Sequence, residues 1–479
     1  MQSESKSSFA QVRMLAVCLL VSLLATPPCD AQDKLVQDGQ IADKPAENVS
    51  HVVPINWKQF ASESVDDQRY QEIVSLLLNC ARYNLSWIER TFELDPAGEA
   101  YVLKGKGEHD VRPACSVVYG MGVVLQCGIY DAKVIGVDEA EAKRRTVRLL
   151  RGIVRAHAAN SEAELAWGVP TPAPDPETYW QTALWASLSG MGGWMLWDEL
   201  DPTTQQMLVA MLADESQRFL AADYQAPYWN GEGGDTKAEE NSWNSMLLTL
   251  SAAMMPEHPD ARLLKQRSSE LMISSYATRA DWKSNETMID GRPVKRWLRG
   301  YNADPGGVVI NHGFIHPDYM VAISMNFWGL TTQSLAGRPV PESWDFNAPL
   351  IYNTCVTKQW DSPPHEKPGG TIYVQGRPNV YYPAGNDWSF HDLTLFYLMD
   401  VYAHEFSWND KATEWMDLRA DAMLKMQERH DDRRMFADGE YDTYSGAEQW
   451  AFWCLTDAFL PQWLKKCGRR VEKRNWLAD

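Results

Sequence analysis

Apolar residues recur at steps of three and four along most of the chain, which is the period of an amphipathic helix. In residues 67–92 the apolar positions form one stripe and the charged positions lie opposite. The same pattern occurs in residues 138–159, 176–199, 203–222, 237–254, 259–281, 317–335, 387–405, 410–430 and 446–466. Caps and first-turn prolines, such as Asp201-Pro202-Thr203, mark several starts. We therefore expect about ten helices, arranged as antiparallel hairpins.

Strand patterns are few and short. They cover residues 308–311, and residues 371–374 with 380–382, which a turn at 376–379 separates. Helix pairs recur at a spacing of roughly 40 to 60 residues, which indicates a repeated supersecondary unit. The pattern predicts an all-α fold with minor β-hairpins.

The first residues have the pattern of a secretory signal. Lys6 and Arg13 precede the apolar run 14–25, and a small-residue exit ends at Ala31. This run of about a dozen residues is shorter than the roughly 20 that cross a bilayer. Residues 1–31 are therefore predicted to be a signal peptide, and the mature protein to be periplasmic or extracellular. Lipid modification at Cys29 is the alternative, although the preceding Pro-Pro fits a lipobox poorly.

The rest of the chain divides into an arm and a body. Residues 32–56 are polar and contain Pro45 and Pro54, which predicts an extended linker or N-terminal arm. Residues 57–479 are predicted to form a single domain. Charges interrupt every later apolar run within about 15 residues, so no membrane span is expected.

Six cysteines follow the leader, an even number that permits up to three disulfides in an exported protein. Cys115 with Cys127, and Cys454 with Cys467, are close enough in sequence to pair, and the sequence leaves the pairing open. We find no C-x-x-C pair and no Cys/His cluster. No metal site and no cofactor are therefore predicted.

The formal net charge of −19 argues against a nucleic acid partner, because binding to phosphates needs a basic surface. One short segment is basic instead: Arg292, Lys295, Arg296 and Arg299 fall within eight residues. A solvated charge run is one explanation. The other is a cationic rim, in which Arg296 and Arg299 bind a carboxylate or sulfate of an anionic substrate.

Tryptophan is abundant, with 21 residues, and many lie in loops rich in Asn, Asp and Gly. Indole rings in such loops offer flat apolar faces with one hydrogen-bond donor, which suits the apolar face of a sugar ring. The composition therefore favours a poly- or oligosaccharide as the partner.

The stretch Y-N-A-D-P-G-G-V-V-I-N-H-G-F-I-H-P-D-Y, residues 301–319, gathers groups that transfer protons. His312 and His316 lie four residues apart, and Tyr319 follows three residues later. Imidazole and phenol groups serve in proton abstraction from a weakly acidic carbon. Satisfied core or capping residues are the alternative explanation.

Two further polar segments are candidate parts of a binding site. The first opens a helix, and in it Asn241 is placed to donate to a substrate carboxylate, with Glu240 and Trp243 beside it. Acidic residues that complement the helix dipole are the alternative. The second segment supplies candidate contacts to a sugar, although Asn386 or Asp387 as a helix cap explains part of it. Its candidates are Tyr382, Asn386 and Trp388.

The segment 307–312 followed by Tyr319, together with Glu240-Asn241-Ser242-Trp243, resembles the catalytic segments of toroid-type polysaccharide lyases. These include hyaluronate and chondroitin lyases, alginate lyases and heparinase II/III-like proteins. The resemblance implies an (α/α) toroid of helical hairpins, here without a large β-sandwich domain. It also implies that Asn241 neutralises a uronate carboxylate, His312 helps to abstract the C5 proton, and Tyr319 acts as base or as acid. His316 is a competing candidate for the base.

Two other functions remain open at this point. A glycoside hydrolase would use two carboxylates, with Glu239 or Glu240 paired with Asp318 or Asp387. A non-catalytic glycan-binding protein would use the tryptophans alone. The lyase is the hypothesis that accounts for Asn, His and Tyr together.

Overall fold

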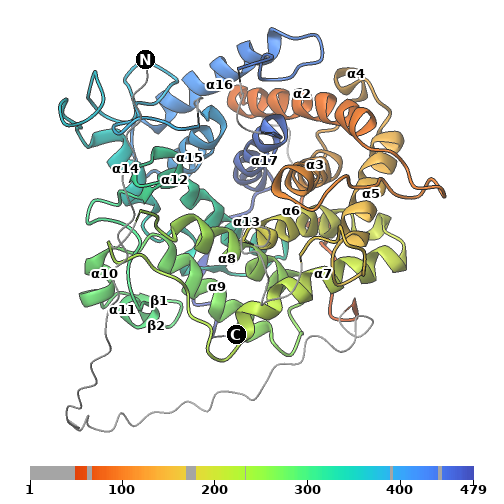
Figure 1. Ribbon diagram of the computed structural model, residues 1–479, viewed down its shortest axis with the longest axis horizontal. Coiled ribbons are helices and arrows are strands. Elements are labelled where there is room, and N and C mark those ends of the chain that lie inside the picture. The colour runs from red at the N-terminus through yellow and green to blue at the C-terminus, as the bar shows by residue number, and fades with distance from the viewer. Residues whose placement is uncertain are drawn as a thin grey trace, which may run out of the picture. The chain divides into compact units, whose positions relative to one another are not determined.

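Helices form nearly all of the regular structure in the computed structural model (Figure 1). It describes residues 49–61, 67–168, 180–231, 234–388, 392–440 and 445–478, all within one compact unit, Gly39–Asp479. The predicted all-α fold is confirmed. The predicted signal peptide lies outside the described residues, as does most of the predicted arm.

Eight helices correspond to stretches with the amphipathic period. They are α2 (Gln68–Thr91), α5 (Glu139–Arg155), α6 (Thr182–Met195), α7 (Pro202–Leu220), α8 (Ala238–Met254), α9 (Ala261–Ser275), α16 (Ala412–Glu428) and α17 (Ala447–Lys466). Asp201 caps α7 as predicted, and Asp67 also caps α2, since both carboxylates accept hydrogen bonds from N–H groups of the first turn.

Other predicted helices differ in their bounds. Residues 259–281 are divided between α9 and α10 (Arg279–Ser284), and residues 176–199 between α6 and the 3-10 turn η3 (Trp197–Glu199). Residues 317–335 form α12 (Pro317–Val321), the 3-10 segment η4 (Ala322–Phe327) and α13 (Trp328–Leu335). The helix expected from residue 387 is α15 (Leu393–Glu405), and Asp392 caps it. The prediction that Asn386 or Asp387 is the cap is therefore wrong.

Four helices in the described ranges were not predicted: α3 (Glu108–Gln126), α4 (Ala132–Ile135), α11 (Val294–Trp297) and α14 (Ala348–Thr357). The longest of them, α3, is buried at every position from Val111 to Leu125. A helix that is apolar on all sides has no polar face, so its sequence lacks the contrast that reveals the helical period. Pro113 inside it further disguised the helix.

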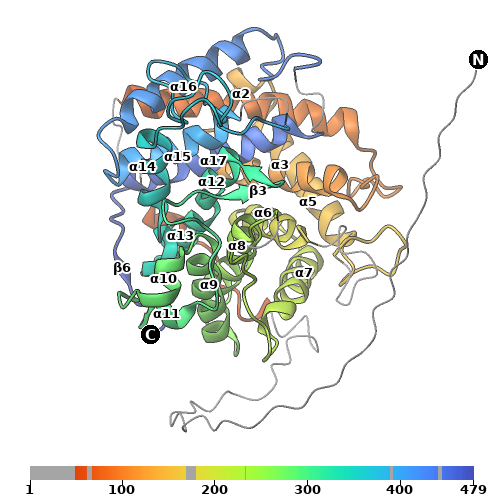
Figure 2. The ribbon, with the colours of Figure 1, turned by 60° about the vertical axis from the view of Figure 1, so that its left-hand side comes forward.

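The most buried helices contact one another in succession (Figures 1 and 2). α17 packs against α3, α3 against α6, and α6 against α8. α8 packs against η4, η4 against α15, and α15 against α17. The more exposed helices α2, α5, α7, α9 and α16 pack on members of this set.

The contact between α3 and α6 is unusually close. A Cβ atom on Gly192 of α6 would lie 2.5 Å from the Val118 carbonyl oxygen of α3. Only glycine permits this approach. The two helices are thereby fixed side by side in the centre of the buried set.

Strands are limited to three two-residue pairs in the described part of the chain. β1 (Met288–Ile289) pairs with β2 (Arg292–Pro293), β3 (Ile310–Asn311) with β4 (Phe314–Ile315), and β5 (Val340–Pro341) with β6 (Lys473–Arg474). The predicted hairpin at 371–382 is reduced to one bridge, Tyr373 with Val380. The 3-10 turns η1 (Trp57–Gln59) and η5 (Glu342–Asp345) complete the structure.

The described end of the predicted arm packs on the body. The Val53 N–H donates to the Met254 carbonyl at 2.8 Å, the Trp194 indole donates to the Val53 carbonyl at 2.9 Å, and Ile55 is buried. No described helix is both long and apolar enough to cross a membrane. The six cysteines in the described part of the chain are free thiols, five of them buried, so none of the open pairings forms.

Candidate functional site

The β3–β4 hairpin presents His312 at its turn. His312 and Gly313 both have positive φ angles, 50° and 82°, as a tight turn between two strands requires. The left-handed backbone costs a side-chain-bearing residue about 1 kcal/mol or more. That cost is offset by the surrounding structure, which holds the imidazole at the tip of the hairpin.

The loop before α8 fixes the hairpin in place. The Thr236 N–H donates to the Ile310 carbonyl at 3.0 Å, and the Gly313 N–H donates to the Gly234 carbonyl at 2.9 Å. These bonds bring the acidic first turn of α8 next to the His312 turn. Two segments some seventy residues apart in sequence therefore meet at one site.

α12 adds the phenol. His316 is the residue before α12, Pro317 starts the helix, and Tyr319 lies within its single turn. The Tyr319 hydroxyl is 3.1 Å from His312 Nε2. The predicted grouping of His312, His316 and Tyr319 is therefore close in space as well as in sequence.

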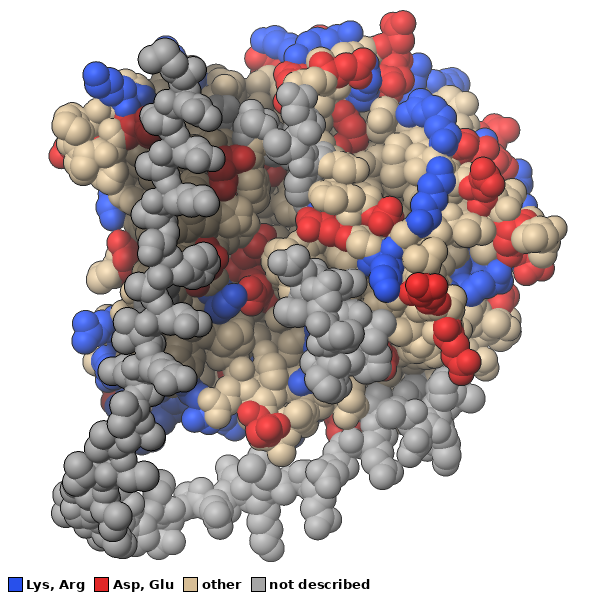
Figure 3. Space-filling model, viewed as in Figure 1, with Lys and Arg blue, Asp and Glu red and all other residues tan. Residues whose placement is uncertain are grey.

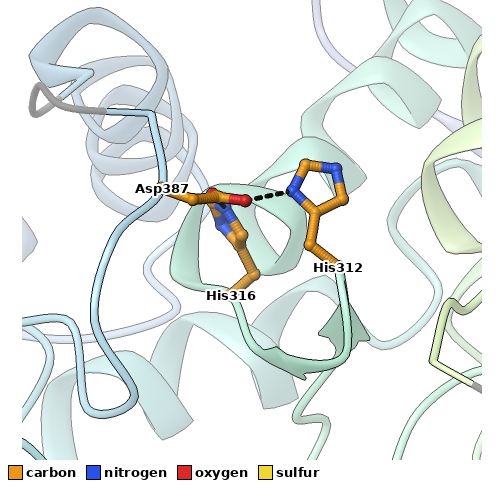
Figure 4. A group of neighbouring side chains, drawn as sticks. All are labelled: His312, His316 and Asp387. Carbon is orange, nitrogen blue, oxygen red and sulfur yellow. Dashed lines mark hydrogen bonds and ion pairs between the residues drawn. The ribbon is translucent and has the colours of Figure 1, made fainter. Parts of the chain in front are cut away.

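Asp387 joins the two histidines (Figure 4). One carboxylate oxygen lies 2.7 Å from His312 Nδ1, and the other lies 3.1 Å from His316 Nε2. Partial burial alone would raise the pKa of Asp387, but the bonds from both imidazoles outweigh it and hold that pKa below its ordinary value. The carboxylate is ionised at neutral pH, so both imidazoles donate to it.

A buried layer supports these groups. His316 Nδ1 lies 3.3 Å from a carboxylate oxygen of Asp318, whose other oxygen accepts a 3.1 Å hydrogen bond from the Tyr382 hydroxyl. The half-buried Trp388 ring packs 5.0 Å from the His316 ring and 5.4 Å from the Tyr319 ring. Tyr382 and Trp388 thus position the histidines. The sequence predicted instead that these two residues contact a sugar.

Tyr319 is held in its protonated form. Burial raises the pKa of its hydroxyl well above the ordinary value, and the charges of Glu239, Asp318 and Asp387 raise it further. Only 6% of Tyr319 is exposed, whereas 39% of the His312 side chain and 43% of the Asp387 side chain are exposed. His312 and Asp387 therefore form the exposed side of this group, and the protonated Tyr319 lies behind them.

Glu239 is a second protonated group at the site. Burial, and then the charge of Glu240, raise the pKa of its carboxyl from 4.5 to about 8. The carboxyl is therefore neutral at pH 7 and able to donate a hydrogen bond. Glu239 lies in the first turn of α8, close enough for its ionised form, which exists above about pH 8, to raise the pKa of Tyr319.

The Glu239 carboxyl gives a stability prediction with a definite sign. Because its folded pKa of about 8 exceeds its ordinary 4.5, its contribution to stability is full below pH 4.5 and is lost as pH rises through 8. We expect Glu239→Gln to melt above the wild type at about pH 9, with a difference that shrinks toward pH 5.

The control for this prediction is Glu428→Gln, which changes an exposed glutamate of α16. The melting temperatures of wild type, Glu239→Gln and Glu428→Gln are compared across the same pH range. Parallel curves for all three proteins would show that Glu239 does not titrate in this way.

The predicted substrate contacts of α8 are enclosed. Asn241 is fully buried, its amide nitrogen donates to the Pro227 carbonyl at 2.9 Å, and its amide oxygen is buried without a hydrogen bond to the described residues. Trp243 is only 1% exposed, and Glu240 pairs with Lys237 at 2.7 Å. This geometry does not support Asn241 as the donor to a uronate carboxylate, and we assign its amide a structural role.

The arginines lie elsewhere on the surface. Arg296 in α11 and Arg299 just after it are exposed, and basic side chains gather in the lower left of the face in Figure 3, the region of α10 and α11 in Figure 1. Within the described residues, neither forms an ion pair with the residues of the site. The Asn386 side chain accepts a 2.9 Å bond from the Trp388 N–H and so shapes its own loop.

The sequence predicted no metal site, and the structure brings two groups of ligating atoms together. His312, His316 and Asp387 form one group, and His157, Asp214 and Glu215 form the other. Asp387 was considered only as a cap or as a rival carboxylate, because nothing in its local sequence links it to residues 75 positions earlier.

Comparison with models of known protein families gives no match, and comparison with curated proteins gives none either. The function is therefore argued from the geometry of the site.

Proposed function

We propose that this protein is an exported polysaccharide lyase that cleaves a uronate-containing glycan by β-elimination. The observation that carries the proposal is the chain of hydrogen bonds from the Tyr319 hydroxyl through the His312 imidazole to Asp387. It joins a proton donor, a base and a carboxylate in one partly exposed site. β-Elimination requires a base for the C5 proton and a proton donor for the departing sugar oxygen.

Each group has a role that follows from its partners. Because His312 Nδ1–H donates to Asp387, the Nε2 atom carries the lone pair and acts as the base. It takes the C5 proton, the C5–H electrons form the C4–C5 double bond, and the C4–O4 bond breaks. Tyr319 gives its proton to the leaving O4, while Asp387 stabilises the imidazolium that forms.

Glu239 takes the role that the resemblance assigned to Asn241. A uronate carboxylate must be neutralised before its neighbouring C–H becomes acidic enough to lose a proton. A carboxyl with a pKa of about 8 is neutral at pH 7 and can donate a hydrogen bond to that carboxylate, and 9% of Glu239 is exposed whereas Asn241 is fully buried. The acidic surroundings of the site are thereby compatible with an anionic sugar at neutral pH.

The architecture supports the same class. The contacts that run from α17 through α3, α6, α8, η4 and α15 return to α17, which is the succession expected of the inner ring of an (α/α) toroid. The outer helices pack on this succession one by one. A signal-like leader and abundant tryptophan fit an exported enzyme that acts on a polysaccharide.

A glycoside hydrolase is the second candidate, and one observation favours it. The pKa of Glu239 is raised to about 8, while that of Asp387 is lowered. Two carboxyls with pKa values pushed apart are the usual pair of acid and base in such enzymes. Both oxygens of Asp387 already accept bonds from imidazoles, which favours the lyase.

The experiment that tests the proposal presents the protein with a panel of polyuronates and neutral glycans. We expect one or more polyuronates to give a product that absorbs ultraviolet light, because elimination forms a double bond conjugated to the carboxylate. Reducing ends without that absorbance would establish the hydrolase. Binding to a glycan without any product would establish the non-catalytic binding protein.

A further inference from the structure

Three atoms of the site converge as metal ligands do. His312 Nδ1, His316 Nε2 and a carboxylate oxygen of Asp387 all lie within 4.8 Å of one another, and Figure 4 shows the three side chains facing a common point. The carboxylate lies 2.7 Å and 3.1 Å from the two nitrogens. Ligands bound about 2.0–2.1 Å from a tetrahedral zinc ion are roughly 3.3 Å apart. Small adjustments of the exposed His312 and Asp387 side chains would place all three atoms on one ion.

A second observation points to the same conclusion. His316 is completely buried, and its Nδ1 faces the buried Asp318 carboxylate at 3.3 Å. Within the described residues, neither Nδ1 nor that oxygen forms a hydrogen bond. An imidazole that binds a metal through one nitrogen usually donates its other N–H to a carboxylate. Asp318 is placed to receive that N–H when His316 Nε2 binds an ion.

We propose that His312, His316 and Asp387 bind one divalent transition-metal ion. Two imidazole nitrogens and one carboxylate favour zinc and similar ions over calcium and magnesium, which prefer oxygen ligands. Each imidazole must offer a lone pair to the ion, so binding shifts the His312 proton from Nδ1 to Nε2 and the His316 proton from Nε2 to Nδ1, where it faces Asp318. The exposed edges of His312 and Asp387 leave further coordination positions open to water.

This inference shares its residues with the proposed active site, but binding does not depend on lyase activity. If the proposed function holds, the ion removes His312 and Asp387 from proton transfer and inhibits turnover. Inhibition would then be relieved by a chelator.

The other group of ligating residues is a poorer site. Glu215 already accepts a 2.7 Å bond from the Thr182 hydroxyl and lies 3.3 Å from His157 Nε2 and 3.1 Å from the Arg218 guanidinium. A cation beside the carboxylate opposes the binding of a metal ion. The second group therefore serves as the internal comparison.

The test is calorimetric titration of the chelator-treated protein with zinc chloride. We expect one ion per chain, and a loss of affinity greater than about 10-fold in Asp387→Asn and in His312→Gln. Asp318→Asn, which acts through His316, should weaken binding by about 10- to 100-fold. Asp235→Asn changes a nearby exposed carboxylate and Asp214→Asn changes the second group, and both should bind as the wild type does.

Asp387 and His312 are exposed, so their variants keep the fold, which circular dichroism verifies. Unchanged zinc affinity in both variants would overturn the inference, and so would loss of binding in Asp214→Asn. A protein that binds zinc at His312 and Asp387 yet cleaves no polyuronate would retain this inference while the proposed function fails.

Discussion

Tyr319→Phe is expected to lower kcat on the polyuronate substrate by about 10²- to 10⁴-fold, the usual contribution of a positioned proton donor. The substitution removes one oxygen atom and keeps the ring that packs against Trp388. The variant therefore cannot protonate the departing sugar oxygen, while the pocket keeps its shape. Steady-state kinetics of the ultraviolet-absorbing product give the measurement.

Tyr130→Phe is the matched control for this prediction. The Tyr130 hydroxyl donates to the Val137 carbonyl at 2.7 Å, outside the site, so its loss should leave kcat unchanged. A Tyr319→Phe enzyme that keeps kcat within a few-fold of the wild type would show that Tyr319 is not the proton donor. His312 would then have to perform both proton transfers.

Asp400→Ala is expected to lower the free energy of unfolding by about 3–5 kcal/mol, the usual cost of leaving a buried charge unpaired. Asp400 in α15 forms a fully buried ion pair with Arg419 in α16, and it also accepts a 2.8 Å bond from the Tyr352 hydroxyl. The Arg419 guanidinium stacks 4.3 Å from the Tyr373 ring. Removing Asp400 leaves this cation inside the protein with no carboxylate.

The effect should extend to the site. The Arg419 Nε–H donates at 3.0 Å to the Pro378 carbonyl, at the start of the loop that carries Tyr382 and Asp387. A displaced Arg419 would loosen that loop, so Asp400→Ala should also lose activity below its melting temperature.

Asp417→Ala in α16 provides the comparison with an exposed ion pair. Asp417 makes two bonds to Arg69, at 2.7 Å and 3.0 Å, but both side chains are more than two-fifths exposed. An exposed pair contributes about 0.2–1 kcal/mol. Chemical denaturation of both variants measures the difference. Equal losses of unfolding free energy in the two variants would mean that burial does not make the Arg419–Asp400 pair more stabilising than an exposed pair.

The sequence predicted helices well where one face is polar. α2, α5 and α16 have bounds within a few residues of the periodic stretches, because each divides its surface between core and solvent. α3 was missed because it is buried on all sides and, unlike the equally buried α6, also contains a proline, Pro113. The breaks inside residues 317–335 were missed for a related reason, since nearly all of that segment is buried.

The site was also predicted only in part. His312, His316 and Tyr319 were predicted together because they lie in one short segment. Asp387 was not predicted as their partner, because the pairing depends on a loop far along the chain that folds back onto the hairpin. The burial that encloses Asn241 and raises the pKa of Glu239 is likewise a product of packing, so the roles of the two residues could not be separated from sequence.

The most direct test of the account is to run the cleavage of the polyuronate in heavy-oxygen water and weigh the products. Elimination moves protons among His312, Tyr319 and the sugar and adds no water across the broken bond. We therefore predict unsaturated fragments that contain no heavy oxygen and are lighter by one water than hydrolytic fragments. Saturated fragments that carry one heavy oxygen at each new reducing end would contradict the account and would identify Glu239 and Asp387 as the reacting pair.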